Sequence, residues 1–243
     1  MTKLPPVTGV FWAQKIIATT LGETAGDALS MSLGLGYVQS SLLLAALFAL
    51  LGGLQLRARR YNPVRYWAAL VATTTLGTTV ADWADRTLGL GYAGGASLLL
   101  ALLCASLLAW YAVEGSIAVG SVVSPRKEAF YWLTLLCSQT LGTALGDWVA
   151  DTESLGYAGS ACIFGGLLAA TALAYWRTRL SRTALFWAAF VLTRPLGAVL
   201  GDLLDKPVAE GGLALSRFGA SAALLAAMAV LMVLAERRSK RVA

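Results

Sequence analysis

The chain has 243 residues, of which 58% are hydrophobic and 13% are charged, and its mean hydropathy is +0.69. A soluble domain carries about 25% charged residues, so this composition excludes an ordinary soluble protein and is typical of a membrane protein. The formal net charge is +6, but the basic residues are concentrated in particular loops, and we expect no binding to nucleic acid.

Eight apolar runs are long enough to be transmembrane helices, since one span needs about 20 residues. In chain order they cover residues 10–29, 38–56, 66–84, 93–113, 130–150, 158–176, 184–204 and 218–235. The first run lacks the small-residue cleavage site of a signal peptide, so we expect it to be a true span. The pattern predicts an all-α membrane protein with eight transmembrane helices in a single integral membrane domain, residues 1–243.

A motif of tryptophan, glycine and aspartate recurs four times, with glycine ten residues after tryptophan and aspartate five residues after glycine. The four sets are Trp12/Gly22/Asp27, Trp67/Gly77/Asp82, Trp132/Gly142/Asp147 and Trp187/Gly197/Asp202. Each set lies in the first of two apolar runs of a repeat, and the repeats cover residues 9–60, 64–113, 129–180 and 184–236, with a cytoplasmic connector at 114–128. Because two spans restore the direction of the chain, we predict four parallel helical hairpins.

The spacing between successive motif tryptophans is 55, 65 and 55 residues, which also fits the duplication of a four-helix unit. We expect the four polar first helices inside and the four oily second helices outside; two four-span halves meeting at an interface are the alternative. Glycine or alanine four residues after the motif glycine predicts close helix packing. We expect the motif tryptophans to be interfacial anchors at the cytoplasmic edge.

The basic residues indicate the orientation of the chain. Fourteen of the 19 Lys and Arg residues lie at the termini or between repeats, at positions 3, 57, 59, 60, 65, 126, 127, 177, 179, 182, 237, 238, 240 and 241. By the positive-inside rule, both termini and the inter-repeat loops are cytoplasmic. We therefore expect a multi-pass protein of the bacterial inner membrane, with the lipid bilayer as its first partner.

Polar residues share one face of the first helix in each of the first three repeats. In the first repeat Thr20, Glu23 and Asp27 lie one turn apart. The equivalent residues are Thr75, Thr78 and Asp82, then Thr140, Thr143 and Asp147, and finally Pro195, Ala198 and Asp202. At a rise of about 1.5 Å per residue the aspartates reach the outer part of the bilayer, where carboxylates solvated at the interface are the simpler interpretation. Glu23 and the threonines lie deeper and favour a cavity or a partner.

Two cations also fall inside apolar runs. Lys15 lies in the inner half of the first run, where its side chain could extend to the cytoplasmic surface. Arg194 lies near the middle of the seventh run beside Pro195. It is expected to be a counter-ion to an aspartate or to Glu23, or a built-in charge that tunes substrate affinity.

Carboxylates and hydroxyls without histidine select hard cations such as Mg²⁺, Ca²⁺ and Mn²⁺. The candidate ligands are Glu23, Asp27, Asp82, Asp147 and Asp202, with Thr20, Thr75 and Thr140 as auxiliary ligands and Lys15 and Arg194 as charge-tuning residues. Protons remain an alternative, as substrate or as coupled ion. Three scattered cysteines form no metal motif. We expect no enzyme activity and no resident cofactor.

At Gly22-Glu23-Thr24-Ala25-Gly26-Asp27 the chain resembles a bacterial family of uncharacterised multi-pass membrane-anchored proteins built from such repeats. That family name implies no mechanism. A looser similarity is to manganese and calcium exporters of prokaryotes, whose signature is Glu-x-Gly-Asp followed by a basic residue. This chain has Glu23-x-x-Gly26-Asp27, one residue longer, with Ala28 in place of the basic residue. The similarity implies cation transport.

We expect a secondary transporter of a hard divalent cation, with Mn²⁺ export favoured. One alternative is a cation channel with a pseudo-fourfold carboxylate ring as its filter. Another is a non-transporting membrane scaffold or accessory subunit. The sequence predicts no particular oligomeric state.

Overall fold

The computed structural model describes residues 3–152 and 155–242, with the side chains of Thr152 and of residues 238–242 left out. The basic side chains at 238, 240 and 241, which contributed to the expected orientation, lie outside this described part. Within it there are eight α-helices and no strand, so the prediction of an all-α protein is confirmed. The helices are α1 (Gly9–Asp27), α2 (Gly36–Arg57), α3 (Pro63–Asp82), α4 (Gly91–Glu114), α5 (Pro125–Thr152), α6 (Gly156–Arg177), α7 (Arg182–Asp205) and α8 (Arg217–Val242).

Five of these helices are long and apolar enough to cross a membrane: α2, α4, α6, α7 and α8. This agrees with a membrane protein. The helices α1, α3 and α5 carry more polar residues, and most of those polar side chains are buried within the protein.

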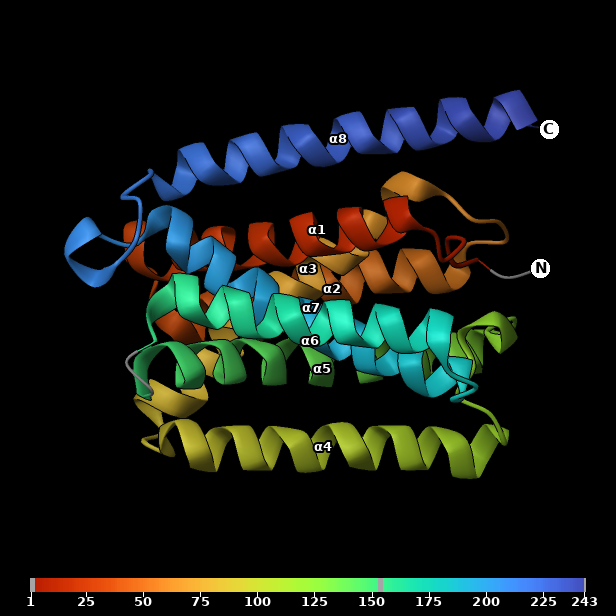
Figure 1. Cartoon of the computed structure of the whole chain (residues 1–243), viewed down its shortest axis with the longest axis horizontal. Helices are drawn as coiled ribbons and strands as arrows, with labels where there is room; N and C mark the ends of the chain where they lie inside the picture. The colour runs from red at the N-terminus through yellow and green to blue at the C-terminus, as the bar shows by residue number, and fades with distance from the viewer. Residues whose placement is uncertain (1–2, 153–154, 243) are drawn as a thin grey trace.

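The first helices of the four repeats form a closed ring in the order α1, α3, α5, α7, with α7 packed back against α1. The second helices lie outside this ring, and each packs on the first helix of the following repeat: α2 on α3, α4 on α5, α6 on α7, and α8 on α1. Figure 1 shows the outer positions of α4 and α8, and both termini at the same end of the bundle. A single hairpin is therefore not a packing unit, because its two helices contact different neighbours.

The motif glycines are the points where neighbouring ring helices touch. Each receives the side chain three residues before the motif glycine of the next repeat: Thr74 on Gly22, Gln139 on Gly77, Arg194 on Gly142 and Thr19 on Gly197. A Cβ atom at Gly77 would lie 3.0 Å from the Gln139 backbone, and at the other three positions it would overlap the neighbouring side chain. The small-residue seams expected from the sequence thus join the four repeats into the ring.

The motif tryptophans differ from expectation. Trp67, Trp132 and Trp187 are buried in an aromatic cluster at the end of the ring where the four first helices begin. They pack against Tyr66 and Tyr131 with ring centroids 5–7 Å apart, the spacing of favourable aromatic pairs. The expectation of interfacial anchors is therefore wrong for these three, since their side chains are buried within the protein.

The opposite end of the ring carries the short turns within the repeats. Two π-helical turns, η1 (Ala28–Ser32) and η2 (Trp83–Thr87), extend α1 and α3 directly after their motif aspartates. The second helices then begin at Gly36, Gly91 and Gly156, whose φ angles of 72°, 65° and 64° favour glycine. The fourth repeat has a longer turn that contains the 3-10 helix η4 (Val208–Glu210).

Candidate cation site

The four motif aspartates and Glu23 are all buried. Their exposed fractions are 1% for Asp27, 2% for Asp82, 6% for Asp147, 4% for Asp202 and 3% for Glu23. The simpler interpretation, carboxylates solvated at a helix end, is therefore not what the structure shows. Buried carboxylates need charged or hydrogen-bonding partners, and these partners define the site.

Asp82 and Asp147 share one cation. Arg86 lies one turn after Asp82, in η2, and its guanidinium is 3.2 Å from Asp82 Oδ1 and 3.6 Å from Asp147 Oδ2. Burial lowers the pKa of Arg86, but the carboxylates of Asp82 and Asp147 outweigh this and raise it above its ordinary value. Arg86 therefore stays charged and holds the second repeat to the third.

Asp27 and Asp202 are bridged in the same way. The Lys206 ammonium lies 2.8 Å from Asp27 Oδ2 and 3.2 Å from Asp202 Oδ1. Arg217 approaches Asp27 at 3.6 Å and Asp205 at 3.1 Å. Burial lowers the pKa of Lys206, yet Asp202 and Asp27 raise it further, so the net shift is upward.

The two bridges follow a pseudo-twofold pattern. In the second and fourth repeats a cation lies four residues after the motif aspartate, and it also contacts the aspartate of the next repeat in the ring. In the first and third repeats that position holds Met31 and Asp151. This alternation agrees with the duplicated four-helix unit suggested by the tryptophan spacing.

A third ion pair lies deeper. Arg194 is fully buried, and its Nη1 atom is 2.9 Å from Glu23 Oε2. Its Nη2 atom donates to the hydroxyls of Thr78, at 2.6 Å, and Thr143. Glu23, Thr78 and Thr143 occupy equivalent positions in the first three repeats, so one guanidinium from the fourth repeat joins all four. Arg194 is the counter-ion to Glu23 that the sequence suggested.

The auxiliary threonines of the prediction are placed differently. The hydroxyls of Thr20, Thr75 and Thr140 donate to carbonyls of their own helices, four residues earlier, at 2.8–3.0 Å. Side chains of this kind satisfy the hydroxyl within the helix. The threonines that contact the buried charges are Thr78 and Thr143.

Lys15 does not extend to the surface. Its side chain is fully buried, and its Nζ atom lies 3.7 Å from the centre of the Phe190 ring. The equivalent positions of the other repeats hold Leu70, Leu135 and Phe190, each buried. The expectation that Lys15 reaches the cytoplasmic surface is therefore wrong, because the closed ring surrounds it.

Among the described residues, the carboxylates converge in two groups of three. Oxygen atoms of Glu23, Asp147 and Asp202 lie within 4.8 Å of one another, and so do oxygen atoms of Asp27, Asp202 and Asp205. Asp202 belongs to both groups, and Asp82 belongs to neither. Three carboxylates at this separation are a suitable oxygen donor set for a hard divalent cation.

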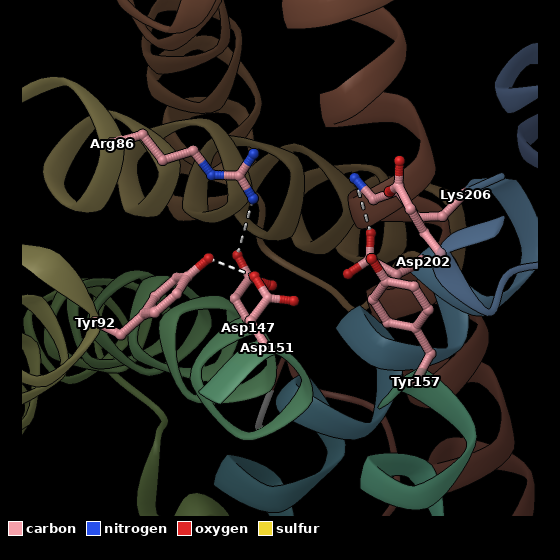
Figure 2. Close-up of a pocket in the computed structure, with 8 residues that line it drawn as sticks. Arg86, Tyr92, Asp147, Asp151, Tyr157, Asp202 and Lys206 are labelled. Atoms are coloured by element: carbon pink, nitrogen blue, oxygen red, sulfur yellow. Dashed lines mark hydrogen bonds and ion pairs between the residues drawn. The ribbon is translucent and has the colours of Figure 1, made fainter. Parts of the chain in front are cut away.

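These groups meet an open pocket of about 340 Å³. Its lining consists of Arg86, Tyr92, Asp147, Asp151, Tyr157, Asp202, Lys206 and Glu210. Figure 2 shows the two bridging cations on either side of the pocket, with the tyrosines of α4 and α6 pointing into it. The hydroxyl of Tyr92 donates to Asp151. The pocket offers four acidic residues and two cations, so its surplus charge is negative.

Sequence reasoning missed the bridging cations, although a signal is present. The second and fourth repeats both contain Asp-x-x-Asp followed by a basic residue, at Asp82/Asp85/Arg86 and at Asp202/Asp205/Lys206.

The second aspartate of this pattern in the second repeat, Asp85, is also buried. Burial raises the pKa of Asp85 to about 6, with Arg86 opposing this shift. Gly95 makes room for Asp85, since a Cβ atom there would overlap its carboxylate.

A comparison with curated proteins and one with solved structures gave no match. A family model, described as Repeat of Unknown Function (DUF347), matches residues 10–61, 65–116, 130–181 and 185–241. The four matches correspond to the four hairpins of the ring and cover most of the chain. The chain therefore belongs to this family of repeats of unknown function.

Proposed function

We propose that the protein is a secondary transporter of a hard divalent cation, with Mn²⁺ as the favoured substrate, and that Glu23, Asp147 and Asp202 form its binding site. The observation that carries the proposal is the convergence of these three buried carboxylates next to an open, acidic pocket. Oxygen donors alone suit Mn²⁺, Mg²⁺ and Ca²⁺.

In this proposal all eight helices cross the bacterial inner membrane, with both termini in the cytoplasm. The five apolar helices support it directly. The helices α1, α3 and α5 would cross as members of the ring, where their polar residues meet one another instead of lipid. The pocket would then open to the outside, as required for the last step of export.

The basic side chains at the site can explain how a bound divalent cation would be released. The bridging cations Lys206 and Arg86 and the central Arg194 neutralise the carboxylates in the structure. A divalent cation that binds Glu23, Asp147 and Asp202 would displace them, and their return would expel it. Such competition gives moderate affinity, and a transporter needs moderate affinity in order to release its substrate.

The central ion pair argues against a channel. Arg194 places a fixed positive charge against Glu23 in the middle of the ring, and Thr78 and Thr143 hold it there. A pore for cations needs a path without such a charge. We therefore favour a transporter that changes conformation.

Binding of Mn²⁺ to the purified protein in detergent tests the site. Calorimetric titration should give one saturable site that is lost in Asp147→Asn and in Asp202→Asn. Glu210→Gln is the matched control, because Glu210 lines the same pocket but belongs to neither carboxylate group. Equal binding by all four proteins would contradict the proposed site.

A further inference from the structure

The end of the ring opposite the pocket is closed by two segments that lie outside the eight helices. The N-terminal segment, Lys3–Leu4, inserts Leu4 into the aromatic cluster, and the connector segment, Ile117–Val122, inserts Val122. The indole of Trp187 also donates a hydrogen bond of 3.0 Å to the carbonyl of Ile117. One segment precedes the first repeat and the other precedes the third, so they repeat the pseudo-twofold pattern of the pocket.

A buried ion pair fastens the N-terminal segment. The Lys3 ammonium pairs with Glu128, in the first turn of α5, and Glu128 is fully buried. The same ammonium donates to the carbonyls of Gln55, at 3.3 Å, and Leu56, at 2.9 Å, in the last turn of α2. The Gln55 amide donates to Glu128 Oε1 at 3.0 Å.

The charges suit the helix ends that they meet. A cation is favourable at the carbonyl end of α2, and an anion is favourable at the start of α5. Removing one partner of a buried pair leaves the other charge without compensation, which is strongly unfavourable. Loss of either charged member should therefore weaken the attachment of the N-terminal segment.

The next layer of side chains toward the pocket is also buried. The hydroxyls of Tyr66 in α3 and Tyr131 in α5, two neighbouring ring helices, are 2.6 Å apart. Lys15 and Arg194 lie beyond this layer, toward the pocket. Both covering segments are non-helical or a single 3-10 turn, so they can withdraw without unwinding a ring helix.

We propose that the segments Lys3–Leu4 and Ile117–Val122 form the gate at this end of the ring, and that the Lys3–Glu128 pair is its lock. The inference rests on the proposed transport function, since a transporter closes one end of its path while the other end is open. In the structure the pocket end is open and this gate is shut.

Thiol accessibility tests the gate without using a substrate. The three native cysteines are replaced by alanine, and Ala69→Cys places one thiol in α3, fully buried in the same cluster as Leu4. The protein is reconstituted into liposomes, and a membrane-impermeant methanethiosulfonate reagent is added to each side in turn. We expect Lys3→Met to speed labelling at least tenfold, from the side of the termini only.

Three further variants decide between a gate and simple packing. Glu114→Gln removes the ion pairs of this partly exposed carboxylate with Arg126 and Lys127 at the same end and should leave labelling unchanged. Lys3→Met combined with Glu128→Gln leaves no unpaired charge but still lacks the lock, so its melting temperature should return toward the parent value while labelling stays fast. Leu4→Gly keeps the Lys3–Glu128 pair but removes the side chain that fills the aromatic cluster, so it should also speed labelling. It serves as the test variant if Lys3→Met folds poorly.

The gate is refuted if Lys3→Met and Leu4→Gly label no faster than the parent, even when their melting temperatures fall. That result would mean that the segments only pack against the ring. Because labelling needs no Mn²⁺, it is independent of the calorimetric test. If the parent bound no Mn²⁺, the proposed function would be overturned, but the accessibility result would still stand.

Discussion

Replacing Arg194 by methionine probes the charge balance at the centre of the ring. Methionine keeps an aliphatic stem against Gly142, where the Arg194 Cβ and Cγ atoms pack, but it removes the guanidinium. Glu23, only 3% exposed, then loses its ion pair. Removing one member of a buried ion pair costs about 3–5 kcal/mol. For a chain of this size each kcal/mol corresponds to about 2–4 °C, so we expect the melting temperature to fall by roughly 6–20 °C.

The proposed site adds a second expectation for this variant. A divalent cation can neutralise the orphaned Glu23 together with Asp147 and Asp202, so Mn²⁺ should restore stability to Arg194→Met more than it stabilises the parent. At a concentration about 100 times the dissociation constant the gain is about 2.7 kcal/mol. Thermal unfolding of the purified protein in detergent, followed with and without Mn²⁺, measures both effects.

The control is the double variant Glu23→Gln with Arg194→Met. It leaves no unpaired charge, so it should recover most of the stability that Arg194→Met loses, and it should gain little from Mn²⁺. If the two single changes simply add in the double variant, Glu23 and Arg194 are not coupled. If Mn²⁺ stabilises the single and double variants equally, Glu23 is not a ligand. Either result would refute the reasoning.

Three further expectations follow from other contacts. Lys206→Met removes the ammonium that competes for the pocket carboxylates and should raise Mn²⁺ affinity about tenfold, or 1.4 kcal/mol, in calorimetric titrations; weaker binding would contradict this. Gly142→Ala introduces a Cβ that overlaps Arg194 and should cost about 1–3 kcal/mol in thermal unfolding, whereas Gly166→Ala, with open space around it, should cost almost nothing. The pKa of Asp85 is raised to about 6, so the folded state holds this proton more tightly than the unfolded state. The stability of the parent relative to Asp85→Asn should therefore fall as pH rises from about 4 to 6 and stay level above it; a difference that rises over this range would show the opposite shift.

Much of the fold could be predicted from the sequence because each repeat has the same packing requirements, and these recur four times. Glycine at a fixed phase is needed where ring helices touch, so Gly22, Gly142 and Gly197 mark the seams. The packing of each second helix on the first helix of the next repeat could not be predicted, because α2 and α4 are largely apolar and their few polar residues do not identify a neighbour.

The candidate site was predicted only in outline. Spacing along a helix gives the face and the depth of Asp27 or Asp147, but not which side chain arrives from another helix. Arg86 reaches Asp147 from a different repeat, across 61 positions in the chain. The π-helical turn η2, which carries Arg86, also leaves no trace in the apolar periodicity, since it adds only one residue to a turn.

The central claim is that Glu23, Asp147 and Asp202 carry a divalent cation across the membrane. The most direct measurement is Mn²⁺ flux in proteoliposomes with an enclosed fluorescent reporter. Flux should be saturable in the parent and in Glu210→Gln, and it should fall at least tenfold in Asp147→Asn and Asp202→Asn. Flux that is equal in all four proteins, or absent from the folded parent under an imposed Mn²⁺ or pH gradient, would contradict the account.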